Sequence, residues 1–284
     1  MPEGDTIFRT ASTLHRALVG QPVTTFETVL PHLSRVEVDS PVAGRVIEKV
    51  EARGKWLLVH FSGDLILLTH MLMSGSWHIY RPGERWQRTR MQMRVVLHTR
   101  GILAVAFNVQ VAEFHSAASL QRRRGFHSMG QSLLTPEFDE AEAVARLRSH
   151  PGLEIGVALM RQSQLAGIGN VFKSEICFSC RVHPFRLVRA LSDEELAALV
   201  ATARKLLQAN VADLSAESLV AYGGFRRTTG HLNPDERLWV YDRAGERCRR
   251  CGTTIECYRQ GSDARTTFWC PRCQPAQALA TSAR

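Results

Sequence analysis

The sequence predicts an α+β protein of several domains: an N-terminal helix with an antiparallel β-sandwich, then a helical domain, then a small cysteine-rich module. Short runs rich in β-branched residues occupy positions 22–115, and helix-like patterns occupy 138–210. Five of the 7 cysteines then fall between 248 and 273. A chain of 284 residues, 44% of them hydrophobic, is long enough to bury a core in each of two domains.

A helix is predicted directly behind the start of the chain, which reads MPEGDTIF. Ile7, Leu14 and Leu18 recur near helical spacing, and Asp5 or Thr6 is expected to cap the first turn. The same opening residues allow a second interpretation, in which the N-terminus itself takes part in chemistry. The helix pattern alone does not decide between the two.

The strand region contains the runs VIEKVEA, KWLLVHF, LILLTHML, MRVVLHT and ILAVAFN. Turn-forming triplets, SGD at 62–64 and TRG at 99–101, punctuate them. Short strands joined by tight turns are typical of hairpins in an antiparallel sandwich or barrel.

The helical domain ends in the segment SDEELAALVATARKLLQAN. Ser192 and Glu195 have the spacing of a capping box, and an apolar stripe follows them. Residues 223–236, which include GG, TTG and NPDE, suit a loop or linker. The small, polar stretch after Gln274 is expected to be disordered.

The chain is basic, with a net charge of +9 and a pI near 9.6. This balance favours a polyanionic partner, most simply a nucleic acid. Two arginine-rich runs, RRR at 122–124 and RAGERCRR at 243–250, fit either such a partner or a solvated face. There is no run of about 18 apolar residues and no apolar signal-peptide core, so an intracellular protein with no membrane partner is expected.

The cysteines CRRC at 248–251 and CPRC at 270–273 have the overall spacing C-x2-C-x18-C-x2-C. Two such knuckles are typical of a tetrahedral zinc site with four thiolate ligands: Cys248, Cys251, Cys270 and Cys273. Four thiolates leave no open coordination position, so the zinc is expected to be structural. Cys257 lies outside the spacing, and Cys177 and Cys180 lie in an apolar stretch, so these three are interpreted as reduced thiols.

The stretch QLAGIGNVFKSE at 164–175 predicts an anion site. Gly167 and Gly169 form a tight connection between two helical runs, and Asn170 stands at the start of the second helix. The free N–H groups and positive dipole end of a helix N-terminus favour phosphate. The alternative is a purely structural loop, but the neighbouring zinc module and the basic charge favour the phosphate clamp.

Two further stretches allow two interpretations each. In RGKWLL, Lys55 begins a strand and is either a functional cation or an edge-strand lysine that opposes aggregation. In HMLMSGSW, Leu72 and Met73 are either core residues or an exposed apolar wedge that inserts into a base stack.

Taken in order, the motifs MPEGDT, RGKWLL, HMLMSGSW, AGIGNVFKSE, VYDRAGERCRRCG and RTTFWCPRCQ resemble the bacterial Fpg/Nei family of DNA glycosylases. The resemblance covers almost the whole chain, residues 2–274. The PEGD opening stands where the Fpg branch has Pro-Glu-Leu-Pro, so the chain is more similar to the Nei (endonuclease VIII) branch. That branch removes oxidised pyrimidines, whereas Fpg prefers oxidised purines.

The resemblance implies a catalytic β-sandwich domain over 2–118 and a helix-two-turn-helix domain over 130–225. It implies a zinc ribbon over 238–274 and leaves 275–284 as a disordered tail. One structural zinc ion and no organic cofactor are expected. Partners are expected to be double-stranded DNA with oxidised bases or abasic sites, bound by a monomer in the cytoplasm, at the nucleoid.

The resemblance also answers the question that the opening residues raise. In the family the start methionine is removed and the new terminal proline, here Pro2, is the nucleophile. An α-amino group has a pKa of about 7.7–8.0, so a useful fraction is neutral near pH 7. Its attack on a sugar C1′ gives a Schiff base, which permits β-elimination without a diffusible cofactor. The adjacent Glu3 resembles the family's proton donor to the sugar O4′.

Other family roles fall on matching residues. Lys55 resembles the hairpin lysine, which contacts phosphate and donates a proton in β-elimination. Arg265 matches the ribbon arginine that grips phosphate and assists δ-elimination. Asn170, with Gly169 before it, matches the phosphate-binding asparagine.

Met73 aligns with the family's wedge, which fills the gap left by a flipped base, and Leu72 is its neighbour. The stretch FNVQVAEFHS lacks the Arg-Phe pair of Fpg, which agrees with a Nei-like enzyme and leaves the opposite base open. Residues 122–131 are expected to hold another DNA contact, which the resemblance does not assign.

The sequence thus predicts a bifunctional DNA N-glycosylase and AP lyase of base excision repair that acts on oxidised bases, most simply pyrimidines, by β/δ-elimination. Two alternatives stay open. One is an AP lyase with weak glycosylase activity, and the other is a non-catalytic zinc protein that binds damaged DNA on the same scaffold.

Overall fold

The structure is a computed structural model that describes residues 2–211, 226–229, 231 and 233–276. The chain divides into two compact units. The first is built on the residues up to Ser128, and the second on Met129–Asn210 together with the described residues from 226 onward. The predicted linker at 223–236 lies largely outside the described residues, as does the tail, of which only 275–276 are described.

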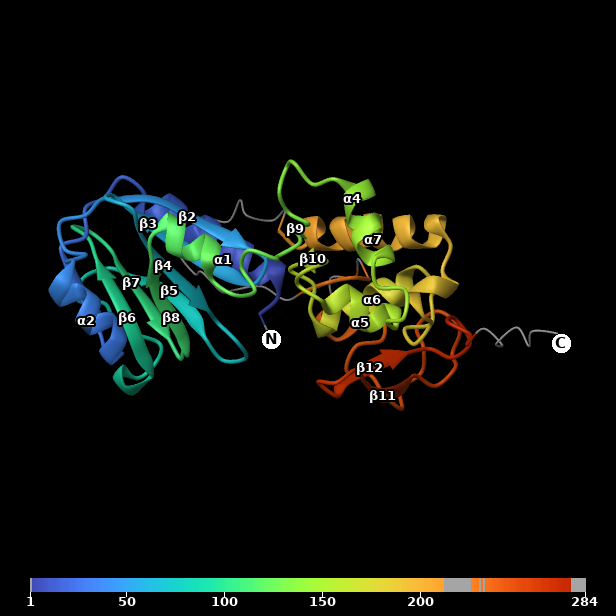
Figure 1. The fold of residues 1–284 in the computed structure, drawn as a ribbon. Coiled ribbons are helices and arrows are strands. Elements are labelled where there is room, and N and C mark those ends of the chain that lie inside the picture. The colour runs from blue at the N-terminus through green and yellow to red at the C-terminus, as the bar shows by residue number, and fades with distance from the viewer. Residues whose placement is uncertain (1, 212–225, 230, 232, 277–284) are drawn as a thin grey trace. The chain divides into compact units, whose positions relative to one another are not determined.

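The first unit contains the antiparallel β-sandwich that the sequence predicts (Figure 1). Every neighbouring pair of strands in its two four-stranded sheets is antiparallel. One sheet has the order β1 (Thr25–Thr28), β6 (Met93–His98), β7 (Leu103–Phe107), β5 (Ser76–Tyr80). The other has the order β2 (Ile47–Arg53), β3 (Trp56–Phe61), β4 (Leu65–His70), β8 (Val111–His115).

The core of this unit lies between the sheets and follows the period of two expected for strands. Leu57, Val59 and Phe61 of β3 face it, and alternate residues of the opposite sheet, such as Val95 and Leu97, meet them. The apolar face of α1 (Gly4–Leu18) closes the same core, because its predicted stripe is fully buried. A second cluster on the outer face of the β5–β7 sheet gathers around Tyr80 and Phe107 and is covered by Trp86.

The predicted cap of this helix is wrong. The N-cap is Glu3, whose backbone carbonyl accepts a hydrogen bond from the N–H of Ile7 at 3.1 Å and whose side chain makes no cap hydrogen bond. Asp5 is fully buried within the first turn, and Thr6 donates to it at 3.3 Å. Both Asp5 and Thr6 therefore lie inside the first turn of the helix and not at its N-cap.

Two short helices in the first unit were not expected. The segment α2 (Pro31–Asp39) packs against β1 and β8, with Leu33 as its one buried residue. The segment α3 (Ala117–Arg122) follows β8 and begins with a capping box formed by Ser116 and Ser119. The sequence pattern favoured strands throughout this region, because single buried residues carry no helical period.

The second unit contains the predicted helical domain. Its helices are α4 (Glu140–Arg148), α5 (Ile155–Met160), α6 (Asn170–Ser179) and α7 (Asp193–Ala209). The predicted capping box is confirmed, because Ser192 accepts from the N–H of Glu195 at 3.2 Å and donates its own N–H to that carboxylate at 2.9 Å. A short parallel pair, β9 (Gln131–Ser132) and β10 (Leu165–Ala166), and the turns η2 (Val188–Ala190) and η3 (Pro234–Glu236) complete the connections. The turn η1 (Arg90–Gln92) belongs to the first unit.

The cysteine module folds as an antiparallel ribbon of β11 (Glu256–Gln260) and β12 (Arg265–Trp269). The ribbon packs on α6, where Phe178 shares a buried cluster with Val240, Ile255 and Phe268. Among the described residues, no helix is both long and apolar enough to span a membrane.

Candidate active site and metal centre

Pro2 and Glu3 lead into α1. Pro2 is half-buried and Glu3 is fully buried. A carboxyl group at a helix N-terminus lies near the free backbone N–H groups and the positive dipole end. The helix packs against β2 and β3, and His15 Nδ1 lies 3.0 Å from the Val50 carbonyl oxygen of β2. The helix that begins at this terminus therefore packs on β2 and β3, and the turn between these two strands contains Lys55.

Lys55 is half-buried in the turn between β2 and β3. Arg53 and Trp56 pair across the hairpin, which leaves Gly54 and Lys55 as a two-residue turn. Gly54 has a φ of 58°, and glycine in the first turn position suits a type II′ hairpin. The edge-strand interpretation of this lysine is wrong, because β3 has a neighbouring strand on both sides.

His70, at the end of β4, is a neighbour of this turn that the sequence did not single out. Its ring meets Trp56 edge to face, with centroids 4.7 Å apart. Burial, with the nearby charges of Lys55 and Arg123, lowers the pKa of His70 to about 4. The ring is therefore neutral at pH 7, and its Nδ1 accepts from the N–H of Leu72 at 3.0 Å. Its place directly before a glycine-containing turn is the signal that could have identified it.

Leu72 and Met73 lie at the turn between β4 and β5. Their exposed fractions are 37% and 66%, so neither is a core residue, whereas the adjacent Met71 is buried. Leu72 has a φ of 49°, which leucine rarely adopts. The turn is also tight, because a Cβ on Gly75 would lie 2.5 Å from the Met71 carbonyl oxygen. The backbone thus holds two apolar side chains toward solvent.

Asn170 is the first residue of α6, and Gly169 before it is the N-cap. Asn170 is only 8% exposed, and its Nδ2 donates to the Thr266 carbonyl at 2.8 Å. Its Oδ1 has no hydrogen-bond partner within the described part of the chain. The connection before the helix depends on glycine, because Gly167 has a φ of 108°.

Two buried charges on α6 tie the helix to the following module. Lys173 is fully buried, and its Nζ donates to Thr267 Oγ1 at 2.5 Å. The buried carboxylate of Glu175 accepts the backbone N–H groups of 239–241, each at 2.9 Å, and the hydroxyl of Thr228. The sequence did not indicate either role, although charges inside the apolar run NVFKSEICF were a signal.

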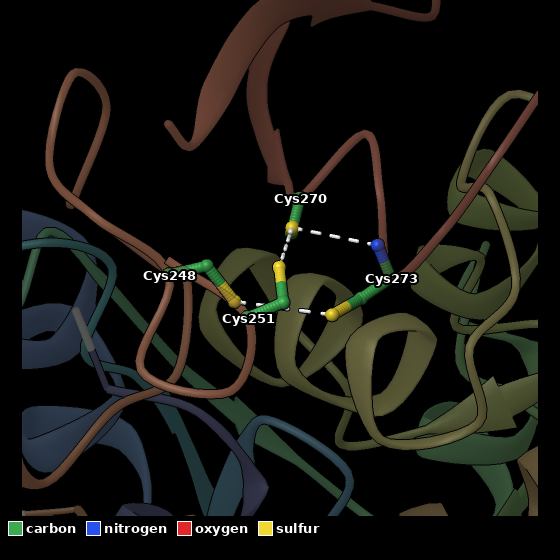
Figure 2. A group of neighbouring side chains, drawn as sticks. All are labelled: Cys248, Cys251, Cys270 and Cys273. Carbon is green, nitrogen blue, oxygen red and sulfur yellow. Dashed lines mark hydrogen bonds between the residues drawn. The ribbon is translucent and has the colours of Figure 1, made fainter. Parts of the chain in front are cut away.

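The four predicted metal ligands converge (Figure 2). Their Sγ atoms all lie within 4.8 Å of one another. Cys248 and Cys273 are 3.9 Å apart, and Cys251 and Cys270 are 3.4 Å apart. Zn–S bonds of about 2.3 Å in a tetrahedron place the sulfurs about 3.8 Å apart. The donor set and its spacing fit a zinc ion held by thiolates alone.

The other cysteines lie away from this cluster. Cys257 is exposed on β11 opposite Phe268. Cys177 is fully buried, and burial raises the pKa of its thiol to about 12. Burial also raises the pKa of Cys180, whose Sγ donates to Thr202 Oγ1 at 3.2 Å. Thiols with raised pKa values are poor nucleophiles, which agrees with a packing role for this pair.

Arg265 is exposed at the start of β12, opposite Gln260. The turn before it is tight, and Ala264 has a φ of 49°. The residue after it, Thr266, supplies the carbonyl that Asn170 binds. The structure thus brings the N-terminus of α6 and the ribbon arginine to neighbouring positions.

The candidate residues divide between the two units. The first unit holds the terminus, the lysine turn and the exposed apolar turn, and the second holds the start of α6, the ribbon arginine and the cysteines. The geometry fixes the surroundings of each residue, and the catalytic and DNA-binding roles stay predictions.

Three family matches cover most of the chain. Residues 1–114 match the formamidopyrimidine-DNA glycosylase N-terminal domain, and residues 129–219 match the H2TH domain of the same enzymes. Residues 245–276 match the zinc finger found in FPG and IleRS.

Whole-chain comparisons give the same result. The chain is 40% identical over 281 residues to the probable endonuclease 8 2 of Streptomyces coelicolor, covering 98% of this chain and 95% of that protein. It is 33% identical over 276 residues to the DNA-(apurinic or apyrimidinic site) lyase Nei2 of Mycolicibacterium smegmatis, covering 97% and 100%. Its fold is similar to that of Lactococcus lactis Fpg in complex with DNA containing an abasic site, with a TM-score of 0.80, 20% identity and coverage of 96% and 100%.

Proposed function

The chain belongs to the Fpg/Nei family of DNA glycosylases, and on that premise we propose that it is a repair enzyme of the endonuclease VIII branch that excises oxidised pyrimidines from duplex DNA and then cuts the strand. The PEGD opening and the endonuclease 8 relatives support the branch. The observation that carries the mechanism is the buried Glu3 carboxyl group directly beside Pro2 at the start of α1.

The first step uses the terminus. After removal of Met1, the neutral Pro2 nitrogen attacks C1′ of the damaged nucleotide, and the bond from C1′ to the base breaks. The base leaves with the proton that the Pro2 nitrogen gives up. The bond from C1′ to O4′ then opens, O4′ takes a proton from the Glu3 carboxyl group, and an iminium forms between Pro2 and C1′. The position of Glu3 supports this assignment, because its carboxyl group is buried at the start of α1, next to Pro2 in the chain.

The second step cuts the strand. The iminium withdraws electrons and acidifies the C2′ proton, and loss of that proton expels the 3′ phosphate by breaking the C3′–O bond. We assign Lys55 to phosphate contact and proton donation in this β-elimination, and Arg265 to the later δ-elimination. Water finally hydrolyses the imine and frees Pro2.

Other residues are assigned to DNA binding. Gly169 and Asn170 are assigned to a backbone phosphate at the start of α6. Met73, with Leu72, is assigned to the gap that the flipped base leaves. The zinc ion, held by the four cysteines, would keep the ribbon that carries Arg265 folded, since a module of this size needs metal to hold its shape.

Borohydride trapping tests the proposal. The protein is incubated with labelled duplexes that carry thymine glycol, 8-oxoguanine or an abasic site, then reduced and run on a denaturing gel. A covalent band that disappears in Pro2→Gly is expected, with thymine glycol trapped better than 8-oxoguanine. Glu3→Gln is expected to lose base release and to retain some cleavage of the abasic site.

The alternatives give different results in the same assay. Trapping on the abasic duplex alone would indicate an AP lyase with little glycosylase activity. No covalent band on any duplex, with DNA still shifted on a native gel, would indicate a protein that binds damage without reacting. Full incision by Pro2→Gly would contradict the proposed nucleophile.

A further inference from the structure

Two cation–π contacts join the Lys55 turn to the segment that follows β8. The guanidinium of Arg123 lies 4.3 Å from the ring centroid of Trp56, and that of Arg53 lies 4.6 Å from the ring centroid of Phe126. Each segment thus supplies one arginine and one aromatic ring to the other. We call these four residues the clasp. Two of them, Arg53 and Trp56, are the residues that pair at the base of the two-residue turn.

Arg123 is fixed on its other side. Its Nε and Nη2 donate to the two carboxylate oxygens of Glu113 at 2.6 and 2.9 Å, and its side chain is only 19% exposed. His115 Nε2 lies 2.8 Å from the same carboxylate. A planar guanidinium held at both donors cannot rotate freely, so its flat face stays against the Trp56 ring.

The segment that carries Arg123 is also anchored. Asp64 accepts the N–H of Ala117 at 2.8 Å, and the capping box of Ser116 and Ser119 starts α3. Phe126, three residues after Arg123, is only 3% exposed. The clasp therefore joins the turn to a support that is itself ordered by hydrogen bonds and burial.

We propose that Arg123 is a positioning residue, which fixes the Lys55 ammonium for strand cleavage by clamping Trp56. The inference rests on the proposed function, since Lys55 has its role only in that reaction. Gly54 gives the turn little restraint of its own, whereas the contacts on both flanking residues limit where Lys55 reaches.

The location of the clasp separates this role from general stability. Trp56 is not among the residues of the core between the sheets, and Arg53 is exposed. Loosening the clasp is therefore expected to disturb the turn more than the sandwich. The assignment also divides the RRR run, because Arg123 is held inside the protein while Arg122 and Arg124 are exposed.

The test measures the single-turnover rate of strand cleavage on an abasic-site duplex at saturating enzyme. Arg123→Gln is expected to lower this rate about tenfold or more, since small misplacements of a reacting group are costly. Affinity for a duplex with a non-cleavable tetrahydrofuran site is expected to change little. Arg85→Gln is the matched control, because this exposed arginine in the loop between β5 and β6 has no hydrogen bond or ion pair with any described residue.

A double-mutant cycle shows whether Arg123 acts through Lys55. In a Lys55→Gln background, Arg123→Gln is expected to cause no further loss of rate, because the group it positions is gone. A second pair of variants, at Trp56, keeps the test valid if Arg123→Gln folds poorly. Trp56→Leu is expected to lose as much rate as Arg123→Gln, and Trp56→Phe, which keeps a ring, is expected to restore most of it.

Three results would overturn the proposal: an unchanged rate in Arg123→Gln, an equal loss with and without Lys55, or a loss accounted for by the unfolded fraction in a thermal melt. A failure of the proposed function looks different, because Lys55→Gln alone would then cleave at the wild-type rate with the clasp intact.

Discussion

Asn170 Nδ2 donates to the backbone carbonyl of Thr266 at 2.8 Å, so the start of α6 is fixed to the strand that begins with Arg265. Asn170 and Arg265 are both proposed to contact phosphates of the cleaved strand. The hydrogen bond from Asn170 to Thr266 thus fixes Asn170 beside the residue that follows Arg265, although the two candidate DNA contacts lie far apart in the sequence.

Asn170→Ala is expected to weaken binding to an abasic-site duplex about threefold to tenfold, because it removes the proposed hydrogen bond to phosphate and the bond to the Thr266 carbonyl of the ribbon. Fluorescence anisotropy at fixed salt measures the change. Asn233→Ala, at the N-cap of η3 in the same unit, is the control and should bind normally. Equal losses in both variants would show that Asn170 acts only through folding.

Glu175→Ala is expected to lower the free energy of unfolding by about 3 kcal/mol, because three buried or partly buried backbone N–H groups lose their acceptor. Chemical denaturation measures this loss. Glu175→Gln retains one oxygen acceptor and should lose less, and the exposed Glu256→Ala should change little. A loss for Glu256→Ala as large as that for Glu175→Ala would contradict the assignment.

The ion pair of Glu113 predicts a pH-dependent contribution to stability. The hydrogen bond from Arg123 lowers the pKa of Glu113 from 4.5 to about 2. A carboxylate whose pKa is lowered by folding stabilises the fold at pH values above the pKa that it has in the unfolded chain. That contribution is lost as the pH falls through the pKa that it has in the folded protein. The difference in melting temperature between wild type and Glu113→Gln should therefore be largest above pH 4.5 and vanish toward pH 2. A difference that is constant with pH would rule out this ion pair as its source.

Cys270→Ala is expected to abolish zinc binding, because three thiolates leave the tetrahedral site incomplete. Metal analysis should find about one zinc per chain in the wild type and in Cys257→Ala, whose thiol lies outside the cluster, and little in Cys270→Ala. Strand cleavage should fall with the metal, since Arg265 loses its support. Normal zinc content in Cys270→Ala would contradict the four-thiolate site.

Met73→Ala should leave the melting temperature nearly unchanged, since the side chain is 66% exposed. Excision from duplex DNA should fall more than excision from a single-stranded substrate, because only the duplex leaves a gap that needs filling. Paired rate measurements on the two substrates test this. A similar loss on both would mean that Met73 contacts the lesion or the backbone instead.

The parts of this protein that the sequence predicted are those set by local pattern. The spacing of four cysteines predicted the metal cluster, and the Ser192–Glu195 box predicted the start of α7. The triplet SGD at 62–64 predicted the turn that joins β3 to β4, where Gly63 and Asp64 have positive φ.

The parts that sequence reasoning missed depend on partners distant in the chain. Glu175 and Lys173 are charges whose burial makes sense only beside the segment at 239–241 and Thr267. The RRR run fitted either a polyanionic partner or a solvated face, whereas Arg123 contacts Glu113 and Trp56. The order of residues along the chain gives secondary-structure propensity and hydrophobic period. It does not show which distant group forms the hydrogen bond or ion pair that a buried charge needs.

The three hydrogen bonds to Glu175 affect which parts of this enzyme unfold together. They join α6 to the segment at 239–241, and the bond from Lys173 to Thr267 joins α6 to the ribbon, so the amide hydrogens of these three parts are expected to exchange together. Damage to the metal site, for instance by oxidants that attack thiolates, would then also disturb the start of α6, where we propose that a DNA phosphate binds. The oxidants that damage DNA bases would in this way also inactivate the protein that we propose excises those bases.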